Sequence, residues 1–230
     1  VWSDSGEVSP LRSGENRVSE LDFAALRAAM VSSQLRTSDV SDTAVIAAMA
    51  SVPREAYIPA ARAASAYIDR PIPLGSGRAL NPPLATGRLL TAAAIAAGDK
   101  VLLIGAAGGY AAALIAAMGA QVVAVEQDEG LGGSGALPAG VIRVKGSLAK
   151  GAPAHAPYDV LVIDGAVEQI PAALLDQLAD GARIATGIVD RGVTRIESGR
   201  KVAGAAGFTR LFDMEMAVLP GFERPKSFAF

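Results

Sequence analysis

The feature that most constrains the fold is residues 101–126, VLLIGAAGGYAAALIAAMGAQVVAVE. Four apolar residues precede Gly105, an alanine-rich segment runs to Met118, and a second apolar run ends at Glu126. An apolar run this short before a glycine predicts a buried strand, and the alanine-rich segment predicts a helix. Strand, glycine turn, helix and a second strand ending in an acid form the first half of a nucleotide-binding βαβ unit.

The glycine spacing narrows the expected ligand. Gly105, Gly108 and Gly109 form G-x-x-G-G, whereas dinucleotide sites carry G-x-G-x-x-G. A looser turn suits a ligand with ribose and adenine but no pyrophosphate, which favours S-adenosylmethionine over NAD. Glu126, at the tip of the second strand, can accept hydrogen bonds from both ribose hydroxyls. The alternative interpretation is that these glycines only allow the helix to pack closely on the strand.

Composition excludes several classes of protein. The 230 residues suffice for one α/β domain with a small appendage. Although 51% of them are hydrophobic, no run reaches the roughly 18 apolar residues of a membrane span, so we expect a soluble, cytoplasmic protein. A net charge of -2 gives no electrostatic footprint for nucleic acid. With no cysteine, disulfides and thiolate metal sites are excluded, and no metal site is predicted.

The chain divides into a tail, a cap and a core, and the cap and the core together form one compact domain. Residues 1–20 are polar and lack a hydrophobic period, which predicts a disordered or loosely docked tail. Residues 21–97 predict a helical cap: one helix over 21–35, and a second opened by Ser38 or Ser41 with Asp42 and stopped near Pro53. An irregular proline-rich wrap follows, and then an amphipathic helix over 84–97.

The core, residues 98–230, continues the α/β pattern. Strands are predicted over 141–144, 158–163 and 183–188, with a helix over 170–178. Residues 130–140 hold five glycines and a proline, which predicts a loop. Asp164 follows its strand at the carboxyl end, where ligands bind in open α/β sheets, although an N-cap or turn role is equally compatible. Residues 193–197, 201–202 and 208–216 are predicted to form antiparallel strands with a glycine-rich connection.

Dispersed residues in the N-terminal half resemble the protein-L-isoaspartate O-methyltransferase family. The likeness runs from about Leu21 to the C-terminus and continues in APYDVLVIDGA, IPAALLDQLADGARI and the closing AVLPGF. The N-terminal residues that carry it are Met30, Gln34, Leu35, Asp42, Val45, Met49, Val52-Pro53-Arg54, Tyr57, Pro59, Ala66-Tyr67, Asp69, Pro71 and Pro73.

This resemblance implies a Rossmann-like, doubly wound class I methyltransferase sheet with antiparallel C-terminal strands. It implies S-adenosylmethionine as methyl donor and, as partner, a protein or peptide with isoaspartyl residues whose carboxylate accepts the methyl group. Asn81 and Asp164 take the catalytic positions; the oligomeric state stays open. The implied cofactor-binding residues are Ala79, Leu80, Gly105, Ala106, Gly108, Gly109, Glu126, Ser147 and Leu148.

The sequence departs from the family pattern at the expected ligand surface. Arg78, Ala79 and Asn81 stand where the family has Gln, Thr and the active-site Ser. Leu103 replaces an acid that contacts the amino-acid part of the cofactor, and Ser147 replaces an aspartate that contacts adenine. Two interpretations follow: a divergent methyltransferase acting on isoaspartyl residues or another acceptor, or a methyltransferase-like binding or regulatory protein with little cofactor affinity.

The chemistry of methyl transfer needs few acids or bases. In-line displacement depends on alignment, which can supply roughly 7 to 11 kcal/mol. A carboxylate acceptor is already ionised at neutral pH, so no general base is required. The single histidine, His155, lies in a proline-flanked segment and is expected to be a surface residue. An NAD-dependent dehydrogenase is disfavoured by the glycine spacing and by the missing catalytic Tyr-Lys or His pair.

Overall fold

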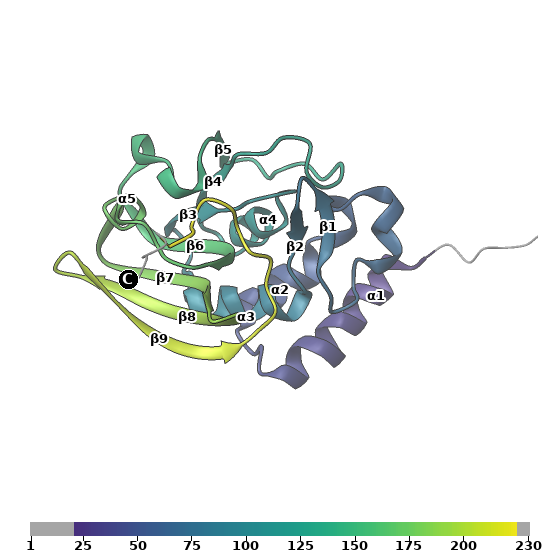
Figure 1. Cartoon of the computed structure of the whole chain (residues 1–230). Helices are drawn as coiled ribbons and strands as arrows, with labels where there is room; N and C mark the ends of the chain where they lie inside the picture. Colours follow the sequence, from purple (N-terminus) through teal and green to yellow (C-terminus); the bar gives the residue numbers. More distant parts are fainter. Residues whose placement is uncertain (1–20, 225–230) are drawn as a thin grey trace, which may run out of the picture.

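The computed structural model describes residues 21–224, so the predicted tail of residues 1–20 lies outside the described part. Its centre is a seven-stranded sheet in the order β5-β4-β3-β6-β7-β8-β9 (Figure 1). Strands β3 to β7 are parallel, and the last two are antiparallel, so the predicted α/β fold class is confirmed. The strands are β3 (Lys100–Ile104), β4 (Gln121–Glu126), β5 (Val141–Lys145), β6 (Tyr158–Val167), β7 (Leu178–Asp190), β8 (Val193–Val202) and β9 (Ala205–Asp213).

Strand β3 lies in the middle of the five parallel strands, and its apolar side chains are covered on both faces. Val101 and Leu103 belong to one buried cluster, and Leu102 belongs to a second cluster on the opposite face. The first cluster includes residues of α3 (Pro83–Ala93) and α4 (Tyr110–Ala117); the second includes Leu174 of the short α5 (Ala172–Leu175). A parallel sheet with two covered faces explains why these strands are continuous apolar runs instead of alternating ones.

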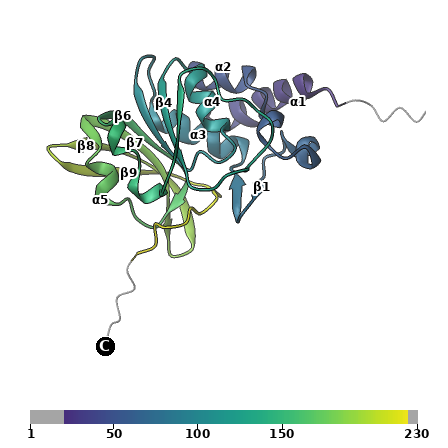
Figure 2. The ribbon, with the colours of Figure 1, turned by 90° about the horizontal axis from the view of Figure 1, so that it is seen from above.

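The two helices predicted over 21–35 and from Asp42 to near Pro53 are observed, and Asp42 is the residue that begins the second. The Asp42 carboxylate accepts from the backbone N–H groups of Ala44 and Val45, at 2.9 and 3.0 Å. The cap lies at the opposite end of the molecule from α5 in both ribbon views (Figures 1 and 2). Its elements are α1 (Phe23–Ala29), η1 (Met30–Leu35), η2 (Arg36–Ser38), α2 (Thr43–Ser51), η3 (Arg54–Tyr57) and η4 (Ala60–Ser65).

The proline-rich wrap is more regular than predicted. It contains an antiparallel pair, β1 (Ile72–Gly75) and β2 (Arg78–Leu80), closed by a turn in which Ser76 and Gly77 have φ of 49° and 70°. Left-handed φ at both turn residues is typical of tight hairpins. The pair places Arg78 in the interior, where its side chain is only 3% exposed.

The predicted loop over residues 130–140 is confirmed, since no helix or strand occurs there. This segment packs against the cap. The N–H of Gly135 donates to the carbonyl of Ala56 at 2.7 Å, and the Tyr57 hydroxyl donates to the carbonyl of Ala136 at 3.1 Å. These hydrogen bonds therefore hold the loop after β4 against the cap.

Two predictions in the C-terminal half differ from the structure in their bounds. The helix predicted over 170–178 is limited to four residues in α5, because Pro171 precedes it and β7 already begins at Leu178. The antiparallel strands predicted after residue 193 are confirmed, but the stretches 193–197 and 201–202 form one strand, β8, which turns through Ala203 and Gly204 into β9. The remaining segments before β6 are the short helices η5 (Leu148–Lys150) and η6 (Pro153–His155).

The chain after β9 returns to the carboxyl edge of the sheet. Val218 forms an isolated parallel bridge with Ala166, and the N–H of Leu219 donates to the carbonyl of Ala166 at 2.9 Å. Within residues 21–224, no helix has the length and apolar character needed to cross a membrane.

Candidate functional site

The glycine turn between β3 and α4 has the backbone that its sequence demands. Gly105 and Gly109 have φ of 79° and 97°, a region that favours glycine. A Cβ at Gly105 would lie 2.8 Å from a methyl carbon of Leu219, and one at Gly109 would lie 2.5 Å from a methyl carbon of Leu137. At Gly108 it would lie 2.5 Å from the carbonyl oxygen of Tyr57. Close packing within the chain thus accounts for all three glycines.

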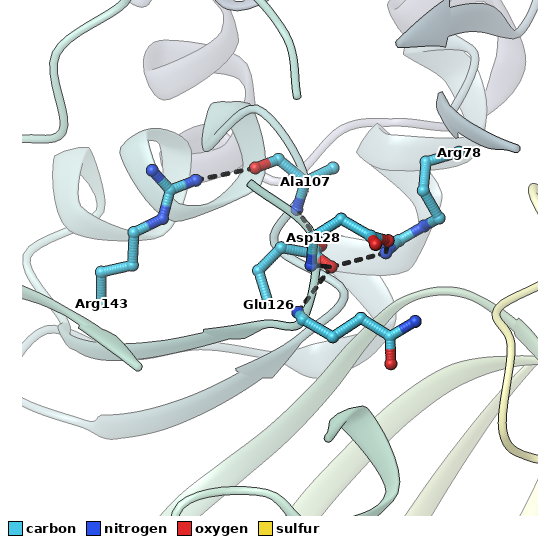
Figure 3. Close-up of polar contacts among 6 residues, drawn as sticks. Arg78, Ala107, Glu126, Asp128 and Arg143 are labelled. Atoms are coloured by element: carbon cyan, nitrogen blue, oxygen red, sulfur yellow. Dashed lines mark hydrogen bonds and ion pairs between the residues drawn. The ribbon is translucent and has the colours of Figure 1, made fainter. Parts of the chain in front are cut away.

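Glu126 faces this turn from the end of β4. Its Oε2 accepts from the N–H of Ala107 at 2.7 Å. Its Oε1 accepts from Arg78 Nη1 at 2.6 Å and from the N–H groups of Gln127 and Asp128 at 2.8 and 3.3 Å (Figure 3). A carboxylate has about four acceptor positions. Four donors from the chain therefore leave little capacity for the two ribose hydroxyls expected here.

Arg78 is the partner of Glu126, and the sequence did not predict this pairing. It attracted notice only as a departure from the family motif, and nothing in the local sequence signalled a buried cation. In the structure its Nη1 also lies 3.5 Å from Asp128 Oδ2, and its Nε is buried without a hydrogen-bond partner in the described part of the chain. The pairing arises because β2 carries Arg78 across the carboxyl end of β4.

An open pocket of about 290 Å³ adjoins Glu126 at the carboxyl ends of β4 and β5. Arg143 on its wall donates from Nη2 to the carbonyl of Ala107 at 2.9 Å, which ties β5 to the glycine turn (Figure 3). This pocket lies at the edge where open α/β sheets bind ligands. The residues that line it are Glu126, Asp128, Glu129, Gly130, Arg143 and Lys145.

The two predicted catalytic residues lie in direct contact. Asn81 Nδ2 donates to Asp164 Oδ1 at 2.8 Å, and Asn81 Oδ1 accepts from the N–H of Ala217 at 2.8 Å. Burial raises the pKa of Asp164 above its ordinary 3.8, opposed by the hydrogen bond from Asn81 and by the nearby cations Arg54 and Arg78. Asn81 therefore links Asp164 of β6 to the C-terminal segment.

The sequence had placed Asp164 at the carboxyl end of its strand, but the strand continues beyond this residue. Strand β6 continues to Val167, and its register with β7 shifts between Ile163 and Ala166. The pairing of β6 with β3 stops at Ile163, so Asp164 lies one residue beyond it. The irregularity lies where the C-terminal segment packs against β6, since a Cβ at Gly165 would lie 2.6 Å from Leu219.

Arg54 supports this pair from the cap. It is fully buried, and it donates from Nε to the carbonyl of Ala66 at 2.7 Å and from Nη2 to the carbonyl of Asn81 at 2.5 Å. Its guanidinium lies 5.0 Å from the ring centre of Tyr110. Arg54 contributed to the family resemblance but received no role from the sequence, because its partners are carbonyl groups distant along the chain.

The remaining predicted cofactor residues differ in accessibility. Leu80, Ala106 and Leu148 are buried in the hydrophobic clusters, as is Leu103 of β3. Ser147 is exposed and follows Gly146, whose N–H donates to the carbonyl of Glu126 at 3.0 Å. Ala79 and Ser147 are thus accessible, and their cofactor contacts stay predictions.

No metal-binding geometry occurs among residues 21–224: the His, Asp and Glu side chains there form no group of three or more that could hold an ion. His155 lies in η6, partly buried and away from the glycine turn. The polar chemistry of the site consequently consists of the Arg78–Glu126–Asp128 cluster and the Asn81–Asp164 pair.

The mixed sheet, its helical cap and the acid beneath the glycine turn define a Rossmann-like methyltransferase architecture. The family model "Protein-L-isoaspartate(D-aspartate) O-methyltransferase (PCMT)" matches residues 26–210. The protein-L-isoaspartate O-methyltransferase of Koribacter versatilis is 35% identical over 205 residues, covering 86% of this chain and 92% of the relative. That of Gloeobacter violaceus is 41% identical over 161 residues, covering 67% and 78%. The chain belongs to this family of methyltransferases.

Solved structures agree on the fold. A protein-L-isoaspartate O-methyltransferase superimposes with a TM-score of 0.70 at 20% identity, covering 86% of this chain and 66% of that chain. A Plasmodium falciparum protein described as a putative member, solved with S-adenosyl-L-homocysteine, gives a TM-score of 0.68 at 18% identity, covering 87% and 99%. The predicted sheet with antiparallel C-terminal strands is therefore the fold of these structures.

Proposed function

We propose that this chain transfers a methyl group from S-adenosylmethionine to the side-chain carboxylate of isoaspartyl residues in damaged proteins. The observation that carries the proposal is the family match over residues 26–210, which spans both the cap and the sheet. Glu126 and the glycine turn, the two parts expected to bind adenosine, touch through the N–H of Ala107 within that span.

The donor side of the site is the edge around Glu126. Glu126 would hold the ribose, the glycine turn would lie against the donor, and the pocket beside Arg143 and Lys145 offers room for adenine near Ser147. When bound, the cofactor supplies an electrophilic methyl group on sulfur. These residues fit the group provided that Arg78 gives up its place on Glu126.

The acceptor side is the pair Asn81 and Asp164. Both are buried, and Asn81 is fixed at both ends of its amide by Asp164 and the N–H of Ala217. A group held this firmly can align an acceptor, which is what methyl transfer to an ionised carboxylate requires. Arg54 holds the carbonyl of Asn81 and so fixes the backbone of the same residue.

A second candidate is a binding or regulatory protein that has lost methyl transfer. The ion pair between Arg78 and Glu126 favours it, because this pair occupies the acid expected to bind ribose. Leu103 favours it as well, since an apolar side chain with no exposed surface cannot replace an acid.

Two measurements separate these functions. Isothermal titration of the full chain with S-adenosylmethionine and S-adenosylhomocysteine should give micromolar binding. Methyl transfer should then be detected with an isoaspartyl peptide and be absent with the same peptide containing normal aspartate. Binding without transfer to either peptide would indicate a methyltransferase with another acceptor. No heat change at millimolar ligand would refute the proposed reaction and favour the binding or regulatory protein.

A further inference from the structure

Arg78 is a buried cation at the acid that the proposed function assigns to the ribose. Its side chain is 3% exposed and that of Glu126 is 2% exposed, and their atoms lie 2.6 Å apart. We propose that Arg78 competes with the ribose diol for Glu126, so that donor binding is an exchange of one partner for the other. The inference rests on the proposed function and adds to it the residue that sets the affinity for the donor.

Arg78 is the exchangeable donor among those around Glu126. The other three donors are backbone N–H groups, of Ala107, Gln127 and Asp128, and they cannot leave without a change in the turn. Arg78 instead reaches Glu126 through a long side chain with several rotatable bonds. Within residues 21–224 Oε2 accepts only from Ala107, so one ribose hydroxyl can bind there, and the second hydroxyl reaches Oε1 only where Arg78 releases it.

A second acceptor is already in place for the released cation. Asp128 Oδ2 lies 3.5 Å from Arg78 Nη1, and its side chain is 29% exposed on the open side of the site. A shift from Glu126 toward Asp128 keeps the guanidinium paired, which avoids the cost of an isolated buried charge. Asp128 also lines the pocket beside Glu126, so the exchange takes place at the mouth of that pocket.

Arg78 does not satisfy all of its hydrogen-bond donors in its present position. Nε is buried without a partner in the described residues, and Nη2 would lie 3.4 Å from a Cβ at Gly105, against the glycine turn. An unsatisfied buried donor lowers the cost of moving the group that carries it. The guanidinium thus occupies the space beside Gly105 where the donor is expected.

The test is the affinity of the full chain for two ligands that differ only in the diol. S-adenosylhomocysteine and its 2′,3′-dideoxy analogue would be titrated by calorimetry into the original chain, Arg78→Gln and Arg78→Lys. Arg78→Gln should bind S-adenosylhomocysteine about tenfold more tightly, since a hydrogen bond to a charged group no longer has to be displaced. Its affinity for the dideoxy analogue should be unchanged, and Arg78→Lys should resemble the original chain.

The matched control is Arg62→Gln, which removes the same charge from an exposed residue and should leave both affinities unchanged. Equal or weaker binding of S-adenosylhomocysteine by folded Arg78→Gln would overturn the exchange, as would an equal gain for the dideoxy analogue. Binding by neither the original chain nor any variant would refute the proposed function, and the exchange with it.

A second variant keeps the test valid if Arg78→Gln does not fold. Asp128→Asn removes the negative charge that would pair with the released cation, so Arg78 should remain on Glu126 and S-adenosylhomocysteine should bind several-fold more weakly, with little change for the dideoxy analogue. A loss of equal size for both ligands would contradict the exchange, because it would place Asp128 in contact with another part of the ligand.

Discussion

Glu126 and Asp164 are buried to nearly the same degree, 2% and 5% exposed, but the two regions around them treat the charge differently. Glu126 has a cation at 2.6 Å and three backbone N–H donors. Asp164 accepts from the neutral amide of Asn81, and burial raises its pKa. Two carboxylates at nearly the same depth thus have different partners, a cation and backbone N–H groups for Glu126 and a neutral amide for Asp164.

This difference matches the two sides of the proposed reaction. In the donor region Arg78 is paired with Glu126, so binding of the methyl donor requires the displacement of this ion pair. The acceptor region holds Asp164 by an amide that is itself fixed by Ala217, so its role is alignment. Variants of single residues in each region test whether the two regions respond differently.

The largest effect is expected from Glu126→Ala. In this variant Asp128, which is partly exposed, is the remaining acidic partner of the buried Arg78. Removing one partner of a buried ion pair lowers the free energy of unfolding by about 3 to 5 kcal/mol. Urea unfolding of the original chain and the variant measures this. The double variant Glu126→Ala with Arg78→Met should recover part of the loss. A loss below about 1 kcal/mol would mean that the pair contributes no more than a surface contact does.

Asn81→Ala should have the next largest effect on stability. It leaves the carboxyl of Asp164 and the N–H of Ala217 without their partner, which costs about 1 to 3 kcal/mol. Methyl transfer to an isoaspartyl peptide should fall more than the affinity for S-adenosylhomocysteine does, because Asn81 is assigned to the acceptor side. An equal loss in both measurements would remove the distinction between the regions.

Asp164→Asn tests the raised pKa. Because the folded-state pKa lies above the ordinary 3.8, the folded chain binds more protons than the unfolded chain between the two values. The contribution of Asp164 to stability is therefore complete at lower pH and is lost as pH rises through its folded-state pKa. Relative to Asp164→Asn, the original chain should lose stability over that window, as measured by urea midpoints at successive pH values. Parallel curves for the two proteins would contradict the raised pKa.

The smallest effect is expected from Ser147→Asp at the end of β5. Ser147 is exposed, so the free energy of unfolding should change by no more than about 0.5 kcal/mol. A carboxylate is a stronger acceptor than a hydroxyl for an exocyclic amine, so S-adenosylhomocysteine should bind about threefold to tenfold more tightly. Calorimetry of the variant beside Ser147→Ala supplies the comparison. Unchanged affinity would place adenine away from β5.

The local pattern was enough to predict the elements that touch the donor side. Apolar runs of four residues, the glycines between them and the closing acid predicted β3, the turn, α4, β4 and the position of Glu126. The poor helix propensity of residues 130–140 predicted the loop there. Each of these depends on neighbours within a few residues, which is the range over which sequence patterns are informative.

The partners of the site residues could not be predicted in the same way. Arg78 contacts Glu126 because β1 and β2 form a hairpin. The prolines of this segment had suggested an irregular chain instead. Asn81 meets Ala217 only because the chain returns to the sheet after β9. Contacts across such separations depend on how elements pack, and no local period records them.

The sequence by itself determined the α/β class, the family and the carboxylates at the sheet edge, because strand burial, turn glycines and dispersed motifs are local properties of the chain. Only the tertiary structure decided that Glu126 is shared with a buried arginine, that the glycine turn is covered by Leu219 and Leu137, and that Asp164 is held by Asn81. The physical reason is that the charge and accessibility of a buried group are set by atoms brought close through packing.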